Sequence, residues 1–324
     1  MRDPPSGSTT IPYAAGTGSV SIPDSFARSV RVSGLDQDAR IGARVYGCDM
    51  AKKTCRINEN LAIGGSSPLS IIAGPCLLES VEMCVEVGRF LESICRKHGF
   101  SYIFKASFDK ANRSSIHSKR GPGLERGIKQ LREIRSTIDC PVTTDIHEAS
   151  QADAVAEVVD LIQIPAFLCR QTDLLIAAAE TGKAINVKKG QFLSPAEMKH
   201  VVHKLEDGGA TEIMVCERGT FFGYHRLVND FIGLGDLMEI GPPVCFDATH
   251  STQLPGASNT SGGRPERAAL LSRAAVAAAV DALFLECHPN PRNAQSDASN
   301  MLPLDELPSL FQTLAAIRNA LCNE

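Results

Sequence analysis

The segment LSIIAG, residues 69–74, is a short apolar run that leads into the turn Gly74-Pro75-Cys76, and it is the first of eight such runs. The others are YIFKA (102–106), PVTTDI (141–146), LIQIP (161–165), AINVKK (184–189), EIMVCE (212–217), PVCFDAT (243–249) and ALFLE (282–286). Apolar runs of this length, bounded by turn residues, are typical of buried strands. Because stretches of helical length separate them, the sequence predicts repeated strand–helix units.

The intervening stretches carry helix signals. SVEMCVEVGRFLESICRKHG (80–99) and GLERGIKQLREIRST (123–137) are amphipathic, and SPAEMKHVVHKLEDGG (194–209) opens on Ser-Pro and ends in Gly-Gly. Eight such units fit a (β/α)8 TIM barrel in number and length. A doubly wound open sheet would favour fewer strands and a glycine-rich first turn, whereas the first turn here reads GPC. We therefore expect an α/β protein with a (β/α)8 catalytic domain over residues 66–324.

Residues 1–65 differ in composition from the rest of the chain. The opening MRDPPSGSTTIPYAAGTGSVSIPDS is rich in Gly, Ser, Thr and Pro and has no sustained apolar period, which predicts a disordered or weakly ordered extension. Met50 is a candidate alternative start, and AKKTCRINENLAIGG after it is compatible with a short strand or hairpin. A transit peptide is less favoured, because acidic residues interrupt the segment.

The overall composition is that of a soluble globular protein. Of 324 residues, 43% are hydrophobic and 22% are charged. No apolar run reaches the roughly 18 residues that span a bilayer. The net charge of −4 argues against a nucleic-acid partner, so an anion site must be a local cluster of cations. The eleven cysteines include no C-x-x-C pair, which indicates free thiols in a reducing compartment, the cytoplasm.

Functional side chains of a TIM barrel follow the carboxyl ends of its strands. Polar residues at these positions are Lys105, Ser107, Lys110, Asn112, Arg113, Ser114, Asp145, His147, Lys188, Gln191 and Arg218. Alone, the loop KASFDKANRSSIHSKRG (105–121) is equally well interpreted as a solvated basic loop. Since Lys188 and Arg218 end other strands, a closed barrel brings several cations to one mouth, where they repel unless anions neutralise them. The pattern predicts a polyanionic substrate carrying phosphate and carboxylate groups.

A second group combines one thiol, one imidazole and two carboxylates. Its members, at the ends of the first, seventh and eighth strands, are Cys76, His250, Glu286 and Asp297. These strands are neighbours in a closed barrel, and the donor set suits Zn²⁺, Fe²⁺ or Mn²⁺. A core thiol, a capped histidine and surface acids remain the alternative interpretation. His200 and His203 compete as a ligand pair, but they lie in a charged helical stretch and are expected to be solvated.

Taken together, the motifs resemble those of the 3-deoxy-D-manno-octulosonate 8-phosphate (KDO 8-phosphate) synthases. The resemblance covers about residues 68–310. The motifs are IIAGPC (71–76), FKASFDKANRSSIHS (104–118), TTDIHE (143–148), IQIPAFLCRQTDL (162–174), NVKKGQF (186–192), ERGTFFGY (217–224), FDATHSTQLPG (246–256), LECHP (285–289) and SDAS (296–299). It implies a transferase that joins phosphoenolpyruvate to D-arabinose 5-phosphate in KDO and lipopolysaccharide biosynthesis.

The resemblance also implies roles for individual residues. Lys105 and Lys110 would hold the phosphoenolpyruvate carboxylate, Lys188 and Arg218 its phosphate with Gln191 nearby, and Asn112, Arg113 and Ser114 the sugar phosphate, with Ser107 also in the substrate site. Lys110, Asn112, Asp145 and His147 are the expected catalytic residues, the last two as proton carriers. Arg170 resembles a residue that reaches the neighbouring subunit's sugar phosphate, which implies a homotetramer.

Cys76 and the KKG at 188–190 look like the metal-dependent form of the family, whose metal-independent members carry asparagine in the first motif. A divalent transition metal and no organic cofactor are therefore expected. Lys119 stands where an aromatic residue is more usual. The nearest rival is 3-deoxy-D-arabino-heptulosonate 7-phosphate synthase, which uses erythrose 4-phosphate, but its second loop usually reads KPRTS. A non-catalytic barrel is the other rival, and no ligand or cation is missing here.

Overall fold

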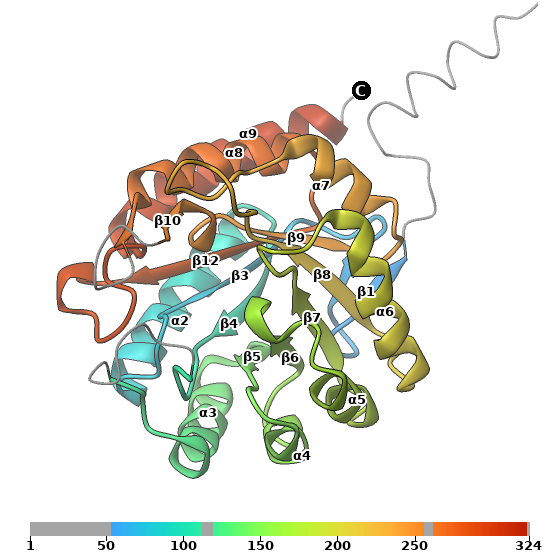
Figure 1. The fold of residues 1–324 in the computed structure, drawn as a ribbon. Coiled ribbons are helices and arrows are strands. Elements are labelled where there is room, and N and C mark those ends of the chain that lie inside the picture. Colours follow the sequence, from blue (N-terminus) through green and yellow to red (C-terminus); the bar gives the residue numbers. More distant parts are fainter. Residues whose placement is uncertain (1–52, 112–118, 256–261, 323–324) are drawn as a thin grey trace, which may run out of the picture. The chain divides into compact units, whose positions relative to one another are not determined.

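The computed structural model describes residues 53–111, 119–255 and 262–322. In this part of the chain eight parallel strands form a closed barrel surrounded by helices (Figure 1). The strands are β3 (Ser70–Gly74), β4 (Ser101–Lys105), β5 (Val142–Asp145), β6 (Leu161–Ile164), β7 (Ala184–Lys188), β8 (Ile213–Glu217), β9 (Val244–Asp247) and β12 (Ala282–His288). Each pairs with the next in sequence, and β12 closes the ring by pairing with both β9 and β3. The predicted (β/α)8 barrel and its eight runs are confirmed.

One helix follows each strand. These are α2 (Val81–Lys97), α3 (Leu124–Ile138), α4 (Ala152–Ala156), α5 (Thr172–Glu180), α6 (Met198–Asp207), α7 (Phe231–Met238), α8 (Ala268–Ala277) and α9 (Leu307–Cys322). Local signals fix where they begin: the Ser80 hydroxyl accepts the Met83 N–H at the start of α2, and Ser194 and Glu197 form a reciprocal capping box before α6. Because their apolar faces pack on the strands, the helices leave the strand ends open for function.

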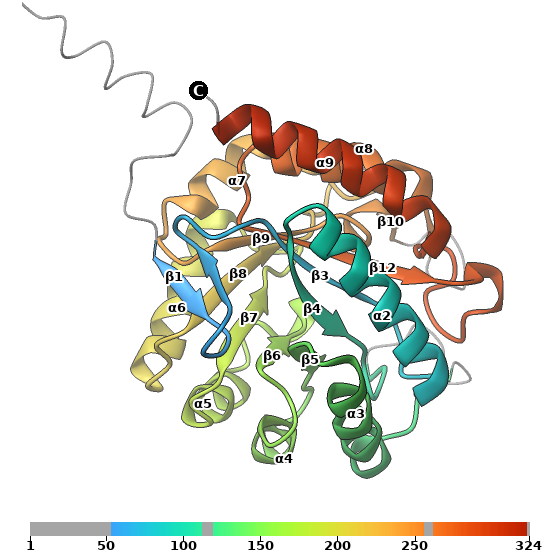
Figure 2. The ribbon, with the colours of Figure 1, turned by 180° about the vertical axis from the view of Figure 1, so that it is seen from behind.

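Two apolar layers stabilise the barrel. One lies between strands and helices, and the other fills the barrel interior with side chains such as Ile72, Met214 and Phe284. The hairpin of β1 (Thr54–Arg56) and β2 (Ala62–Gly64) lies against the barrel (Figure 2). Its side chains Cys55, Ile57 and Ile63 join the inner layer.

This hairpin matches the short strand or hairpin expected after Met50. Residues 53–65 are nevertheless ordered, which differs from the weakly ordered extension expected there, because their apolar side chains are covered by the barrel interior. Three-residue strands carry too little periodicity to reveal this in the sequence. Residues 1–52 lie outside the described residues.

Backbones approach closely where the site begins. A Cβ at Gly74 would lie 2.2 Å from the carbonyl oxygen of Lys105, so only glycine lets β3 and β4 end side by side. β12 runs to His288, two residues beyond the predicted run ALFLE (282–286), because β13 (Leu302–Pro303) pairs with its last two residues. A second short pair, β10 (Gln253–Leu254) and β11 (Gly262–Gly263), follows β9.

None of the helices within the described ranges combines the length and apolar character needed to cross a bilayer.

Candidate active site

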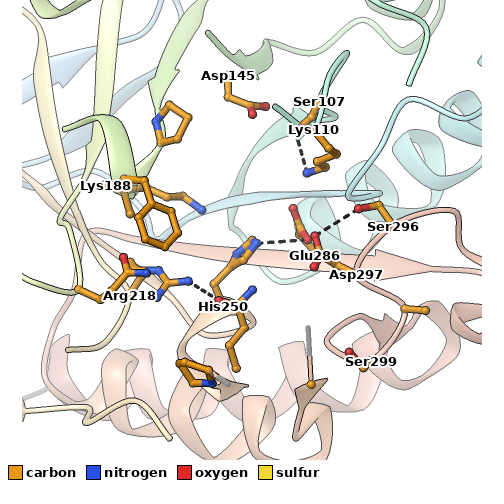
Figure 3. A pocket seen from close by; sticks show the side chains of 18 of the residues that line it. Ser107, Lys110, Asp145, Lys188, Arg218, His250, Glu286, Ser296, Asp297 and Ser299 are labelled. Atoms are coloured by element: carbon orange, nitrogen blue, oxygen red, sulfur yellow. Dashed lines mark hydrogen bonds and ion pairs between the residues drawn. The ribbon is translucent and has the colours of Figure 1, made fainter. Parts of the chain in front are cut away.

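A cavity of about 650 Å³ opens at the carboxyl ends of the barrel strands (Figure 3). Ten of its lining residues were predicted from the sequence: Lys105, Ser107, Lys110, Asp145, Lys188, Gln191, Arg218, His250, Glu286 and Asp297. Cations and acids therefore share one mouth, as barrel closure requires. A mixed cavity of this size accommodates small phosphorylated substrates.

Lys188 and Arg218 supply positive charge on the β7–β8 side of the cavity. The Lys188 ammonium pairs with Asp247 and lies 3.6 Å from the centre of the Phe284 ring. Burial alone would lower the pKa of Lys188, but the Asp247 carboxylate raises it, so the side chain stays charged. Arg218 donates through Nη2 to Gln253, and its buried Nη1 has no hydrogen-bond partner among the described residues. An unpaired buried guanidinium N–H is a site for an anionic ligand.

Lys105 and Lys110 supply the charge on the opposite side. Lys105 is 1% exposed; its Nζ lies 2.5 Å from Glu286 Oε1 and 3.3 Å from the carbonyl oxygen of Cys76. Lys110 Nζ donates to Ser107 Oγ at 3.1 Å. Burial alone would lower the pKa of Lys110, but the surrounding acidic groups, including Cys76 and Glu286, raise it well above its usual value. Both lysines therefore link the anion site to the acidic group at Cys76.

Asp145 and His147 form a pair at the end of β5. His147 Nε2 lies 3.0 Å from Asp145 Oδ2, and the His147 ring is not among the residues that line the cavity. Although burial alone would raise the pKa of Asp145, the hydrogen bond from His147 and the charges of His147 and Lys110 hold it well below its usual range. Asp145 is thus a carboxylate that faces the cavity, with His147 behind it.

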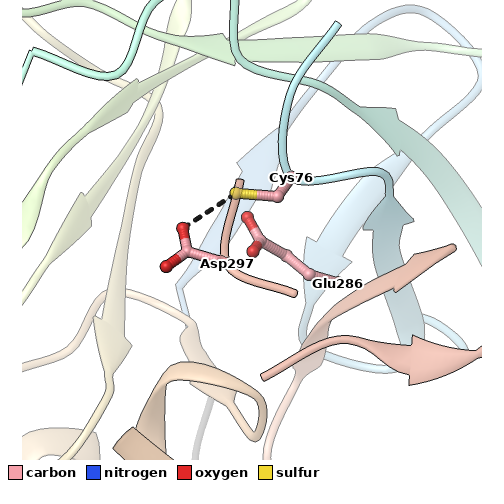
Figure 4. A group of neighbouring side chains, drawn as sticks. All are labelled: Cys76, Glu286 and Asp297. Atoms are coloured by element: carbon pink, nitrogen blue, oxygen red, sulfur yellow. Dashed lines mark hydrogen bonds between the residues drawn. The ribbon is translucent and has the colours of Figure 1, made fainter. Parts of the chain in front are cut away.

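Cys76, Glu286 and Asp297 meet at one point (Figure 4), where one donor atom from each lies within 4.8 Å of the others. Cys76 Sγ lies 3.0 Å from Asp297 Oδ2. Burial first, and then the charges of Asp297 and Glu286, raise the pKa of the Cys76 thiol well above its usual value. Ionising the Cys76 thiol beside these two carboxylates is therefore energetically costly without a cation, and a bound cation would remove this cost.

His250 joins the group through Glu286. Its Nε2 lies 3.5 Å from Glu286 Oε2, a buried oxygen with no hydrogen bond to the described residues. This separation is long for a hydrogen bond, yet it is close to the about 3.3 Å between neighbouring ligands of a tetrahedral zinc ion. One soft sulfur, one imidazole nitrogen and two carboxylates suit a divalent transition metal. The residues present therefore fit such an ion.

Six predicted residues are not placed among those that line the cavity: Cys76 and His147, described above, and four others. Asn112, Arg113 and Ser114 lie outside the described residues. Arg170 is exposed and lines a separate cavity of about 100 Å³ beside α6, together with His200 and Lys204. His200 and His203 are exposed, as expected from the sequence.

Two residues at this site were missed in the sequence. Gln163 lines the cavity from β6, and Asp247, at the end of β9, bonds to both Lys188 and His250. The signal was one polar residue inside an apolar run, in LIQIP and in PVCFDAT. Strand alternation would have placed Gln163 on the same inward face as Leu161, because successive side chains point to opposite faces.

Comparison with known proteins adds independent evidence. The family model that matches, over residues 50–321, is described as the DAHP synthetase I family. A 2-dehydro-3-deoxyphosphooctonate aldolase of Cyanothece sp. is 54% identical over 267 residues, which are 82% of this chain and 98% of that relative. Proteins of the same name from Fusobacterium nucleatum (53% over 254 residues, 78% of this chain and 91% of the relative) and Desulfotalea psychrophila (50% over 263 residues, 81% and 94%) are also similar.

Proposed function

The chain belongs to the DAHP synthetase I family, and from this premise we propose that it condenses phosphoenolpyruvate with D-arabinose 5-phosphate and water. The products are 3-deoxy-D-manno-octulosonate 8-phosphate and inorganic phosphate. The observation that carries this function is the identity of 54% to an enzyme of the corresponding name across 98% of that enzyme's length. The cation-lined cavity supports it, because both substrates are anions.

The cations divide between the two ends of phosphoenolpyruvate. Lys188 and the unpaired Nη1 of Arg218 would bind its phosphate, while Lys105 and Lys110 would bind its carboxylate. The methylene carbon then attacks the sugar aldehyde and forms the new C–C bond. Water adds to the carbon that bears the phosphate, and cleavage of its C–O bond releases inorganic phosphate. Fixed cations favour this step because they position two substrates that otherwise repel each other.

We propose that the chain is of the metal-dependent form, with the ion held by Cys76, His250, Glu286 and Asp297. A divalent transition metal there would supply Lewis acidity towards the aldehyde or the attacking water. Asp145 faces the same cavity as a carboxylate, so it can accept a proton from the water, and His147 orients it. Asn112, Arg113 and Ser114 remain the proposed sugar-phosphate residues.

A substrate comparison tests this function. Purified protein should release phosphate from phosphoenolpyruvate with D-arabinose 5-phosphate at least tenfold faster than with erythrose 4-phosphate. The physical reason is that a site built to bond hydroxyls and phosphate discriminates against an aldose that leaves those groups unpaired, at about 1–3 kcal/mol for each unpaired group. Colorimetric phosphate release, with product mass by mass spectrometry, measures the preference.

Omission of the aldose is the control for simple phosphatase activity. Equal or reversed preference for erythrose 4-phosphate would assign the chain to the rival heptulosonate synthase. If phosphate is released with neither aldose, the chain is the non-catalytic barrel.

We further propose a cytoplasmic homotetramer in which Arg170 approaches a neighbouring subunit's cavity. Side chains near the mouth support an interface there: Phe167, Phe222, Tyr224 and Ile232 are between 50% and 94% exposed. Large apolar side chains that are exposed to this extent are typical of a contact surface. Nine described cysteines are free thiols, which supports a reducing compartment.

The subunit proposal is tested by mass and by Arg170→Ala. Light scattering should give four times the 34.7 kDa of the chain. Arg170→Ala should keep this mass but raise KM for the sugar phosphate about tenfold, because one charge-assisted hydrogen bond is lost. Arg132→Ala on α3, which removes an exposed pair with Glu157, is the matched control and should change neither value. A monomeric mass, or an unchanged KM in Arg170→Ala, would contradict the proposal.

A further inference from the structure

Asp247 is a fully buried carboxylate that touches both halves of the candidate site. Its Oδ2 accepts from Lys188 Nζ and from His250 Nδ1, the latter at 2.7 Å. Its Oδ1 accepts the His250 backbone N–H at 2.9 Å and the Thr249 hydroxyl at 3.1 Å. Thr249 Oγ1 in turn accepts the Glu286 backbone N–H at 3.2 Å. One carboxylate therefore connects an anion-binding cation with two candidate metal ligands.

These contacts determine which nitrogen of His250 carries the proton. A carboxylate can only accept hydrogen bonds, so the neutral imidazole must hold its N–H on Nδ1, towards Asp247. The lone pair then lies on Nε2, which faces Glu286 Oε2 at 3.5 Å. Two acceptors that face each other at this distance are stable when a cation lies between them. The Asp247 contact thus presents His250 as a ligand.

We propose that Asp247 is a positioning residue that holds His250 with Nε2 directed at Glu286. Through its contact with Lys188, it also fixes the position of this anion-binding cation relative to the metal ligands. This inference rests on the proposed function for the identity of the substrate. Asp247 is not among the residues that line the cavity; it acts through Lys188 and His250. Carboxylates behind histidine ligands fix ring orientation in this way.

Asp247→Asn is the informative substitution, because it keeps the shape and removes one acceptor. If the amide nitrogen replaces Oδ1, it faces the His250 backbone N–H, which cannot reverse. If it replaces Oδ2, it faces the Lys188 ammonium and forces His250 Nδ1 to accept, which moves the ring proton to Nε2. Either orientation weakens the presentation of Nε2 to a metal.

The metal dissociation constant of Asp247→Asn should be about 10–100 times that of the wild type, measured with Zn²⁺ by competition with a chromophoric chelator. ¹⁵N-histidine NMR of the metal-free proteins should show His250 protonated on Nδ1 in the wild type and shifted towards Nε2–H in the variant. At saturating metal, kcat should fall about tenfold or more, because Lys188 and His250 are no longer held in position. KM for phosphoenolpyruvate should change less than kcat, because Lys188 keeps its charge.

Asp281→Asn is the matched control. Asp281 is also buried, and its Oδ2 accepts the Val244 N–H at the opposite end of β9. It should lower the melting temperature without changing metal affinity or the His250 tautomer. Thr249→Val is a second variant, which loosens Asp247 without removing its charge and should raise the metal dissociation constant severalfold. If Asp247→Asn does not fold, Thr249→Val tests the proposal in its place.

Metal affinity within twofold of wild type in Asp247→Asn, or an equal loss in Asp281→Asn, would overturn the inference. A wild type that binds no transition metal would overturn it as well. Failure of the proposed function is separate: protein that binds metal but turns over phosphoenolpyruvate with neither aldose would refute the activity. The binding and NMR comparisons do not depend on turnover.

Discussion

Thorough chelation should reduce phosphate release to background, and Zn²⁺, Fe²⁺ or Mn²⁺ added back should restore it. The carboxylates of buried Glu286 and half-buried Asp297 meet the Cys76 thiol at a point that has no described cation other than the nearby lysines. Cys76→Ala should therefore lose both bound metal, measured by elemental analysis, and activity. Full activity without any bound metal would contradict the metal site and leave the lysine and arginine cluster as the only electrostatic catalyst.

The affinity of this site for its metal should depend on pH. Because burial and the neighbouring acids raise the pKa of the Cys76 thiol, the metal-free thiol is protonated at neutral pH. Binding as thiolate then releases this proton, so affinity should rise about tenfold per pH unit up to that raised pKa and fall as the pH drops. Chelator competition at pH 6, 7 and 8 measures the slope.

Cys76→Asn separates the metal from the rest of the site. Relatives of the metal-independent form carry asparagine here, and an amide can orient water or substrate by hydrogen bonds. This variant should bind no metal and keep a residual activity that chelators do not affect. Chelator-sensitive activity in Cys76→Asn would show that the ion is held elsewhere.

Lys105→Met should destabilise the metal-free protein by about 3–5 kcal/mol in the free energy of unfolding, because it leaves the buried Glu286 without its closest cation. Urea unfolding at pH 7 measures this loss. Although burial alone would raise the pKa of Glu286, the charge of Lys105, together with that of Lys110, holds it below its usual range. A carboxylate with a depressed pKa contributes stability above its unfolded pKa and loses it as the pH falls, so the destabilisation should shrink in acid.

The double variant Lys105→Met, Glu286→Gln is the control, since it removes both charges and should recover most of the lost stability. Phosphate release should be lost in both variants, because Lys105 and Glu286 belong to the proposed substrate and metal sites. If Lys105→Met is as stable as the wild type, Lys110 already compensates the charge of Glu286.

Much of the fold follows from local sequence. Each barrel strand lies within, or one to two residues beyond, its predicted apolar run, because a buried strand needs apolar side chains at nearly every position. The burial of the 54–64 hairpin in the barrel interior and the extension of β12 to His288 were not predicted, since both depend on pairing or covering by distant segments. Neither segment has enough residues of its own to show a period.

The candidate site, like the fold, follows only in part from the sequence. The sequence by itself determined the barrel and the kinds of residue that end its strands, because period-two burial and turn residues are local properties. Only the tertiary structure brought Cys76 within 3.0 Å of Asp297, 221 positions away, and paired Lys105 with Glu286. It alone revealed Asp247 as the common partner of Lys188 and His250. Barrel closure places β3 beside β12 and sets their register, and that register, which no local pattern encodes, decides which side chains meet.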